Sequence, residues 1–271
     1  MNEQALRELM CEVGRRIYQR EMVAANDGNF SVKLNADTFL CTPTGISKGF
    51  MTPDMICVVD KEGNSKQDNG QYKPSSEVKM HMRIYKERPD VNSVVHAHPQ
   101  FATAYAIAGI PLTEKIMPEA VIFLGEVPIA KYGLPSTAEI PDAVEPFLSS
   151  YDAVLLENHG ALSWGADLMA AYFKMEGLEF YASLAYKAKM LGGAKQLPEF
   201  EVDRLYDLRR KFAVPGKHIA DNLDKHESMD SYDSIHTSDV INTTEETIKQ
   251  LPISKKQIEE IVQLVINQLS Q

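Results

Sequence analysis

The sequence predicts a three-layer α/β/α fold with a mainly antiparallel central sheet. Short β-type runs and helical periods are mixed along the chain, without the regular alternation of strand and helix that builds a doubly wound parallel sheet. The chain has 271 residues, of which 44% are hydrophobic, so it can bury the core of one large domain and still carry an appendage. These observations favour one globular, enzyme-sized unit followed by a shorter segment.

The first predicted element is an amphipathic helix, because apolar residues recur at helical spacing from Leu6 to Ile17. Residues 30–34, 38–43 and 55–60 are then short runs of β-type residues, and Gly, Asn and Pro turn signals separate them. Runs of this length and spacing are typical of an antiparallel meander.

A helix is expected from Ser75 to Glu87, because a serine near the first turn can cap free amide groups and Pro89 ends the helical pattern. The elements expected after it are a strand at 93–98, a helix at 101–109, a strand near 122–130, a helix before Ser149, a hairpin at 153–165 and a helix at 166–191. Strands and helices are thus mixed as far as the end of this long helix.

The composition changes after about residue 213, where a stretch rich in Ser, Thr and Asp lacks any apolar period. We therefore expect a main domain at 1–215, a flexible polar linker at 216–249 and a C-terminal amphipathic helix at 250–271. The apolar side chains that form one stripe on this helix are Ile258, Ile261, Val262, Val265, Ile266 and Leu269. A single helix of this length is marginal in water, so its stripe is expected to dock on another surface.

Charge and cysteine usage exclude several classes of function. The formal net charge is −10 and the chain has no Lys/Arg cluster, which disfavours nucleic acid as a partner. The N-terminal segment is charged throughout, so it predicts neither a signal peptide nor a membrane span. Cys11, Cys41 and Cys57 have no metal or disulfide spacing and are expected to be reduced, buried thiols of a cytoplasmic protein.

Two histidines stand one residue apart at the end of the strand expected at 93–98. Residues i and i+2 of a strand project to the same face, so His96 and His98 can both reach one metal ion. Such a pair alone is more often structural, but His159 follows another apolar strand at a glycine-containing bend. Three neutral imidazoles with one open position form the catalytic type of zinc site.

Glu77, at the start of the helix before this strand, is the candidate acid/base. A carboxylate beside a divalent cation stays ionised, and it can ligate the metal or take a proton from carbon. His81 lies four residues further along the same helical face and is the rival ligand, although packing or hydrogen bonding is its more common role. His218, His226 and His236 lie near or in the polar segment and are expected to be solvated.

Three short polar stretches, at 26–29, 42–45 and 75–77, are rich in small residues with free amides and hydroxyls. Each alone would be explained by ordinary turn or cap chemistry. Together they predict a phosphate cradle, since glycine allows close backbone approach and a helix N-terminus adds positive potential. The residues expected to hold the phosphate are Gly28, Asn29, Thr44, Gly45, Ser75 and Ser76.

These stretches, together with VNSVVHAHP at 91–99 and ENHGAL at 157–162, resemble in order and spacing the signature segments of the class II aldolase/adducin family. The resemblance runs from the opening helix to about residue 212, and it is closest to the L-fuculose-1-phosphate aldolases and similar sugar-phosphate aldolases. It implies an α/β/α fold and a homotetramer with active sites at subunit interfaces.

The resemblance also implies one Zn²⁺ per chain, held by His96, His98, His159 and, in the free enzyme, Glu77. The glutamate that matches Glu77 acts as the acid/base during turnover, and the residues that match the phosphate cradle hold a sugar phosphate. The implied reaction cleaves a ketose 1-phosphate, L-fuculose 1-phosphate or a similar deoxyketose phosphate, into dihydroxyacetone phosphate and a small aldehyde such as L-lactaldehyde.

Other reactions of the same family remain open. The similar 4-epimerases carry aspartate after the Ser-Ser pair, so Glu77 favours an aldolase, whereas the family's sugar-phosphate dehydratases also use glutamate. An alternative that is not an enzyme is a non-catalytic, adducin-like interaction module. The adducin heads lack the metal histidines, which disfavours that alternative here.

One departure from the family concerns the aldehyde. The fuculose-phosphate aldolases place a tyrosine of the adjacent subunit near the aldehyde and another near the end of the core. The first region of this chain has Met117 and no tyrosine, and residues 211–218 contain none either. Tyr132 is a candidate substitute, and the aldehyde specificity stays open.

The tail is a second departure, because compact aldolases of this family end near residue 215. A polar linker followed by a short amphipathic helix is similar to the encapsulation peptides that direct enzymes into bacterial microcompartments. Residues 250–271 would then bind a shell or co-cargo protein, and the enzyme would lie inside a microcompartment rather than free in the cytoplasm. The alternative is a helix that packs on its own tetramer or forms a coiled coil with neighbouring tails.

Overall fold

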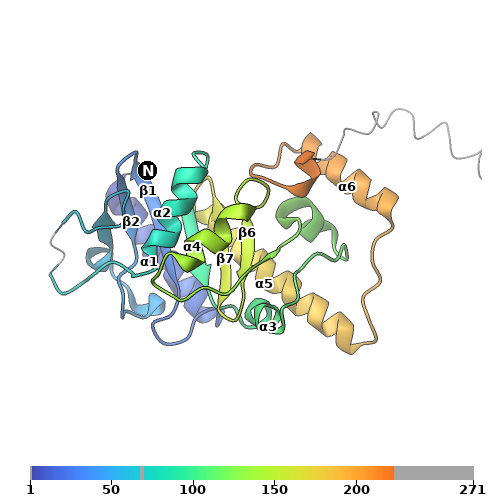
Figure 1. The fold of residues 1–271 in the computed structure, drawn as a ribbon, viewed down its shortest axis with the longest axis horizontal. Helices are drawn as coiled ribbons and strands as arrows, with labels where there is room; N and C mark the ends of the chain where they lie inside the picture. Colours follow the sequence, from blue (N-terminus) through green and yellow to red (C-terminus); the bar gives the residue numbers. More distant parts are fainter. Residues whose placement is uncertain (1, 68–69, 223–271) are drawn as a thin grey trace, which may run out of the picture. The chain divides into compact units, whose positions relative to one another are not determined.

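The computed structural model describes residues 2–67 and 70–222, which form a sheet flanked by helices (Figure 1). Among these residues the sheet has seven strands in the order β3–β2–β1–β4–β7–β6–β5. The strands are β1 Asn29–Asn35, β2 Thr38–Cys41, β3 Cys57–Val59, β4 Ser93–Ala97, β5 Ile129–Ala130, β6 Ala153–Leu156 and β7 Gly160–Gly165. Every neighbouring pair is antiparallel except β5 and β6, so the predicted sheet is confirmed.

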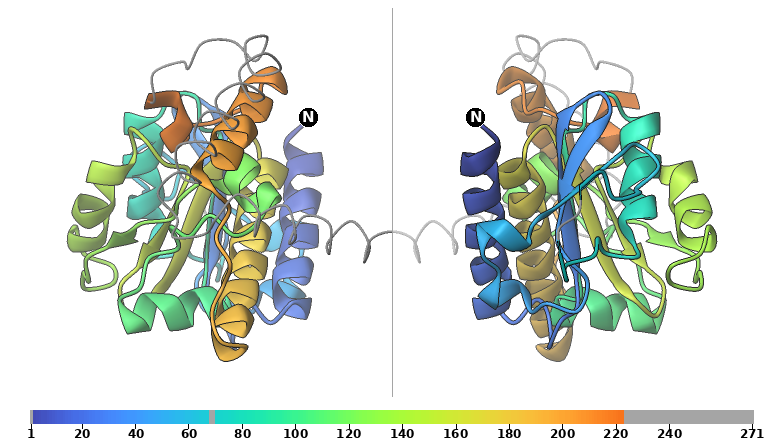
Figure 2. Two further views of the ribbon diagram at one scale, coloured as in Figure 1. Left: turned by 90° about the vertical axis from the view of Figure 1, so that its right-hand side faces the viewer. Right: turned by 90° about the vertical axis from the view of Figure 1, so that its left-hand side faces the viewer.

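Helices cover both faces of this sheet. They are α1 Glu3–Gln19, α2 Val78–Glu87, α3 Gln100–Ala108, α4 Glu139–Val144, α5 Leu168–Met190 and α6 Glu199–Lys211. Figure 2 shows α1 and α5 on one side of the sheet and α2 and α4 on the other. The three layers expected from the sequence are therefore present.

The alternation of side chains on β4 decides which residues reach which layer. Val95 and Ala97 pack into the core that includes α1 and α5, whereas Val94 packs into the core that includes α2. His96 lies two residues beyond Val94 and shares its face, because side chains alternate along a strand. The histidine therefore points toward the side of the sheet that carries α2.

The register of the central strands brings three chain segments to one end of the sheet. In the pairing of β1 with β4, Asn29 lies opposite His96. In the pairing of β4 with β7, Ala97 lies opposite Ala161, next to the turn that carries His159. The start of β1, the end of β4 and the β6–β7 turn thus meet, and the predicted site residues lie there.

The strand expected near 122–130 is mostly wrong. Ala120–Leu124 form a π-helical turn instead, and only Ile129–Ala130 pair as a strand. The turn ends at Gly125, which has a φ of +75° and donates its amide to the Ala120 carbonyl. α6, which the sequence analysis does not assign, covers the turn through apolar contacts with Val121.

The prediction that His218 is solvated is also wrong. Its side chain is 2% exposed, its Nε2–H donates to the Val121 carbonyl at 2.8 Å, and its Nδ1 accepts from the Ala220 amide. Burial lowers the pKa of His218 to about 4, so the ring is neutral. The compact unit extends to Asn222. The predictions for His226, His236, the rest of the linker and the helix at 250–271 concern residues outside the described part.

Two further expectations concern the cysteines and the membrane. Cys11, Cys41 and Cys57 are free and buried, which confirms their assignment as thiols in the core. Within the two described ranges, no helix combines the length and hydrophobicity that crossing a membrane requires.

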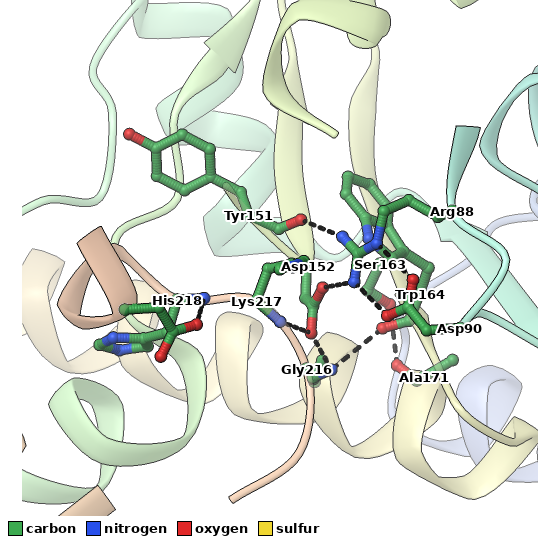
Figure 3. A network of polar contacts seen from close by, with 12 residues as sticks. Arg88, Asp90, Tyr151, Asp152, Ser163, Trp164, Ala171, Gly216, Lys217 and His218 are labelled. Carbon is green, nitrogen blue, oxygen red and sulfur yellow. Dashed lines mark hydrogen bonds and ion pairs between the residues drawn. The ribbon is translucent and has the colours of Figure 1, made fainter. Parts of the chain in front are cut away.

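A buried ion cluster ties the end of the described chain to the sheet (Figure 3). The Asp152 carboxylate is buried just before β6 and accepts from Arg88 at 2.8 Å, from Lys174 of α5 at 2.6 Å and from the backbone amide of Lys217 at 3.1 Å. Gly216 passes so close that any β-carbon would overlap the Asp152 carboxylate, and its φ of +95° also favours glycine. The cluster joins three elements to the C-terminal segment.

Replacing Asp152 with alanine is expected to lower the free energy of unfolding by about 3–5 kcal/mol, because Arg88 and Lys174 lose their shared buried counter-charge. Urea unfolding followed by circular dichroism measures the loss. Glu201→Ala is the matched control, since the exposed Glu201–Arg204 pair contributes at most about 1 kcal/mol. Equally small losses in both variants would contradict a stabilising role for the cluster.

Candidate active site

β4 presents the first two histidines of the site. His96 is fully buried, and its Nδ1–H donates to the Ala161 carbonyl at 2.9 Å, which leaves the lone pair of Nε2 directed away from β7. His98 follows the end of the strand, and its Nδ1 lies 3.3 Å from a carboxylate oxygen of Asp27. The two Nε2 atoms are 3.2 Å apart, so both histidines face one point, as the strand periodicity predicts.

The third histidine comes from the tight turn between β6 and β7. Asn158 has a φ of +55°, and the His159 amide donates to the Leu156 carbonyl, so the turn reverses the chain at once. Gly160 follows, and a β-carbon there would lie 2.6 Å from both the Ala97 carbonyl oxygen and the His98 ring. Only glycine at this position lets the turn lie against His98.

The three imidazoles form a compact group. Their ring centroids are 4.8–5.0 Å apart, and one nitrogen of each lies within 4.8 Å of the others. The Nε2 atoms of His96 and His98 approach each other to 3.2 Å. Ligands about 2.0–2.2 Å from a tetrahedral metal lie roughly 3.3–3.6 Å from one another. The group can therefore hold a metal ion.

Glu77 lies opposite this group, immediately before α2. Its Oε1 is 3.5 Å from His159 Nε2 and its Oε2 is 3.6 Å from His96 Nε2. Asn29 Nδ2 donates to Oε2 at 2.7 Å, while Oε1 is buried without a hydrogen-bond partner. A carboxylate that faces imidazole lone pairs at these distances fits a site that a cation completes.

Burial keeps two of the histidines, His96 and His159, in their metal-binding form. Burial, with smaller contributions from His98 and His159, holds the pKa of His96 well below its usual value. Burial also lowers the pKa of His159, although the charge of Glu77 opposes this shift. Neutral imidazole is the form that ligates metals, so His96 and His159 require no deprotonation near neutral pH.

His81, the rival ligand, has a structural role. It is 1% exposed, its Nδ1 lies 2.8 Å from Ser31 Oγ, and Ser31 Oγ in turn lies 2.7 Å from the Tyr85 hydroxyl. Burial lowers its pKa to about 3. The network joins α2 to β1 behind the site, in agreement with the more common role that the sequence analysis gave to His81.

The three stretches predicted to bind phosphate lie side by side. The Thr42 amide donates to the Phe30 carbonyl, the Ser75 amide donates to the Thr42 carbonyl, and Pro43 pairs with Pro74. Each stretch is thereby held next to the following one by backbone contacts. The first is also linked to Glu77 through Asn29, so the cradle and the histidine group are continuous.

The residues of the cradle differ in exposure. Asn29 and Ser75 are buried, whereas Thr44, Gly45 and Ser76 are exposed, and Ser76 Oγ accepts from the Ser136 hydroxyl at 2.8 Å. Gly28 and Gly45 both have a φ of +73°, a conformation that other residues seldom adopt. A β-carbon on Gly28 would also meet Val23 and the His96 carbonyl, whereas the space beside Gly45 is open.

Two residues near the site were missed by the sequence analysis. Asp27 contacts His98, and Lys48 opens a short 3₁₀ turn, Lys48–Phe50, three residues after Gly45. Lys48 is almost fully buried, which is unusual for lysine. The sequence offered one signal for Lys48: it is the first charged residue after the uncharged residues 42–47.

The candidate substitute for the missing tyrosine lies in an exposed loop. Tyr132 follows β5, its side chain is 55% exposed, and its amide donates to Glu157. Met117 lines an apolar groove of about 1110 Å³ between α5, the π-helical turn and residues 212–215. The described residues thus give the site no buried tyrosine at the aldehyde position that the sequence analysis considered.

Comparison with known proteins places the chain in a family. Residues 8–186 match the model of the class II aldolase and adducin N-terminal domain. An L-fuculose phosphate aldolase of Methanococcus maripaludis is 36% identical over 65% of this chain and 93% of its own length. A 3-oxo-tetronate 4-phosphate decarboxylase of Haemophilus influenzae is 33% identical over 69% of this chain and 89% of its own length.

Solved structures agree with this placement. YgbL of Klebsiella pneumoniae, named as an aldolase, epimerase or decarboxylase, superposes with a TM-score of 0.70 at 31% identity, over 76% of this chain and 99% of that one. An L-fuculose 1-phosphate aldolase superposes with a TM-score of 0.69 at 28% identity, over 77% of this chain and 96% of that one. The matched family model, the fold and the histidine group agree, and we conclude that this chain belongs to the class II aldolase and adducin family as an enzyme of the aldolase type.

Proposed function

We propose that the protein is a zinc-dependent aldolase that cleaves a ketose 1-phosphate, L-fuculose 1-phosphate or a similar deoxyketose phosphate, into dihydroxyacetone phosphate and a small aldehyde such as L-lactaldehyde. The observation that carries this proposal is the Glu77 carboxylate, which faces His96 and His159 at 3.6 and 3.5 Å beside a cradle of backbone and hydroxyl donors. The similarity to L-fuculose phosphate aldolases supports the choice of substrate.

His96, His98, His159 and Glu77 would hold the metal, one ion per chain. Three imidazoles and a displaceable carboxylate suit zinc, although such a donor set also accepts other divalent cations. A divalent cation bound there would polarise the substrate carbonyl and stabilise negative charge on its oxygen.

Glu77 would carry the proton at the carbon next to the carbonyl. In the cleavage direction it protonates the enediolate of dihydroxyacetone phosphate, and in the synthetic direction it removes that proton. Oε1 is free of hydrogen bonds, whereas Oε2 is held by Asn29, so one oxygen orients the carboxylate and the other is available for proton transfer.

The phosphate of the substrate would lie in the cradle. Gly28 and Gly45 let the backbone approach it, and Asn29, Thr44, Ser75 and Ser76 supply hydrogen-bond donors. Backbone amides and hydroxyls at fixed positions would orient the substrate, so that its carbonyl faces the histidine group.

A second candidate is the decarboxylation of a 3-oxo-tetronate 4-phosphate. Loss of carbon dioxide from that acid leaves the same enediolate of dihydroxyacetone phosphate, so Glu77 and the cradle would serve without change. Aldol cleavage must also remove a proton from a substrate hydroxyl, whereas decarboxylation does not. The missing tyrosine and the similarity to 3-oxo-tetronate 4-phosphate decarboxylases favour this candidate. The related dehydratase and 4-epimerase reactions would leave the carbon skeleton intact.

We further propose that the enzyme is a homotetramer. The apolar groove near α5 supports association, because Phe123, Phe173, Phe180 and Phe212 line it and are each more than half exposed. For the tail, the sequence pattern supports binding of residues 250–271 to a microcompartment shell or co-cargo protein, so the enzyme would act in the cytoplasm or in such a compartment.

Metal content and product release test the reaction together. The purified protein is expected to contain about one zinc per chain. It should release dihydroxyacetone phosphate from L-fuculose 1-phosphate, L-rhamnulose 1-phosphate or 5-deoxyribulose 1-phosphate, and a chelator should abolish the release. Release from 3-oxo-tetronate 4-phosphate alone would establish the decarboxylase instead. Bound metal with no release from any of the four would exclude both candidates.

Replacement of Glu77 by glutamine is expected to lower kcat by about 10²–10⁴-fold, since an amide can neither deliver the proton to the enediolate nor take it up. Steady-state kinetics on the substrate identified above measure the loss, and metal analysis shows whether the site still fills. Glu87→Gln, on the exposed end of the same helix, is the matched control and should retain activity. Equal activity of both variants would rule out Glu77 as the acid/base.

Removal of residues 228–271 is expected to leave activity and tetramer mass unchanged and to abolish co-purification with shell proteins. Activity assays, light scattering and affinity capture measure these three properties. A truncated protein that no longer forms tetramers would instead assign the tail to the assembly of the enzyme itself.

A further inference from the structure

Lys48 is a buried lysine that joins two stretches of the phosphate cradle. Its side chain is 1% exposed, and Nζ donates to the Asn26 carbonyl at 2.9 Å and to the Ile46 carbonyl at 2.6 Å. Asn26 opens the stretch that contains Gly28, and Ile46 follows Gly45 directly. The ammonium group therefore lies between the two loops whose glycines face the proposed phosphate.

This ammonium group lacks a close counter-charge. Among the residues that the structure describes, no carboxylate lies within 4.0 Å of Nζ. Arg88, which is similarly buried, has carboxylate oxygens of Asp90 and Asp152 at 2.7 and 2.8 Å. A buried charge without a counter-ion is costly, so an anion that binds beside Lys48 gains from pairing with it.

The buried and half-buried charges next to the cradle, apart from Lys48, are carboxylates, because Lys73, whose carbonyl accepts from the Thr44 amide, is exposed. The six predicted phosphate residues are uncharged, while Asp27 precedes Gly28 and Glu77 follows Ser76 in the chain, and both carboxylates would repel a phosphate dianion. Burial lowers the pKa of Lys48 to about 8, and the charges of Asp27 and Glu77 limit this shift. A phosphate that binds near these carboxylates needs a cation nearby, and Lys48 is the buried lysine next to both loops.

The surrounding packing fixes the lysine in place. α1 passes so close to this turn that a β-carbon on Gly14 would overlap the Lys48 carbonyl, and a β-carbon on Gly49 would lie 2.6 Å from the Tyr18 ring. The backbone of the turn is therefore pressed against α1, and its first side chain is directed inward. The position of the ammonium group is therefore fixed by packing, unlike that of a surface lysine, which moves in solvent.

We propose that Lys48 determines the specificity of the site for phosphorylated substrates: it holds the loops at 26–29 and 44–46 together and supplies the positive charge that a phosphate dianion requires. This inference rests on the proposed function, because it assumes that the substrate carries a phosphate. It assigns to a residue outside the predicted cradle the charge that the cradle itself lacks.

Binding of glycerol 3-phosphate, a stable phosphate monoester, tests the proposal. Calorimetry on the full-length protein, both zinc-loaded and chelator-treated, should show about 10- to 100-fold weaker binding for Lys48→Met. Lys48→Arg keeps the charge and should recover part of the affinity. Lys61→Met removes an exposed lysine in the turn after β3 and is the matched control, with unchanged affinity. In turnover, Lys48→Met should raise KM for the phosphorylated substrate far more than it lowers kcat.

The pH dependence of wild-type binding is a second test, which needs no variant. A phosphate monoester is a dianion above about pH 7, so its own charge is constant from there upward. Lys48 loses its proton above about pH 8, and the affinity should then fall by up to about tenfold per pH unit. The neighbouring ionisable groups are Asp27, Glu77 and, on α1, Tyr18. The affinity of Lys48→Arg should stay constant across this pH range, because arginine keeps its charge.

The outcomes separate this inference from the proposed function. Wild-type affinity in a folded Lys48→Met, or a wild-type affinity that stays constant between about pH 7.5 and 9.5, would overturn the role of Lys48. The second result decides the matter even if the methionine variant does not fold. Absence of product release with intact, Lys48-dependent binding of glycerol 3-phosphate would overturn the proposed reaction and leave the role of Lys48 standing.

Discussion

The pairing register of β4 is the constraint on which the site depends. β4 lies between β1 and β7, and its residues Val94 and His96 face the layer that contains α2. Asn29 is therefore opposite His96, and the turn that carries His159 comes alongside His98. A shift of one residue in either pairing would turn the histidines toward α5 and separate them from Glu77. The same register that builds the hydrophobic layers thus also assembles the donors.

Burial determines the charge state of the site. Burial keeps His96 and His159 neutral, and their rings lie beside that of His98. Glu77 supplies a negative charge there, and Lys48 supplies a positive charge a short way off, at the loops. Imidazole donors beside a carboxylate, with a buried lysine at the neighbouring loops, suit a substrate with a polarisable carbonyl at one end and a dianion at the other.

Much of the fold and of the site was predictable because the signals were local. The apolar period of α1, the alternation on β4 and the glycine-rich turns each follow from residues close in sequence, and so do the two histidines of the HxH pair. The π-helical turn at Ala120–Leu124 was not predictable in this way, because a short apolar run also predicts a strand. Its conformation depends on packing against α6 and on His218, which lies about a hundred residues away. The burial of Lys48 is likewise a tertiary effect, since α1 covers it.

Gly160 shows that a site can depend on a residue that contributes no atom to its chemistry. The space that a side chain would fill there is occupied by the His98 ring and the Ala97 carbonyl. A transplant of the three histidines and the glutamate to another antiparallel sheet would therefore fail unless the strand beside the HxH pair also began with glycine. A design based on this site must therefore specify five positions: the three histidines, the glutamate and a glycine whose missing side chain leaves room for the His98 ring.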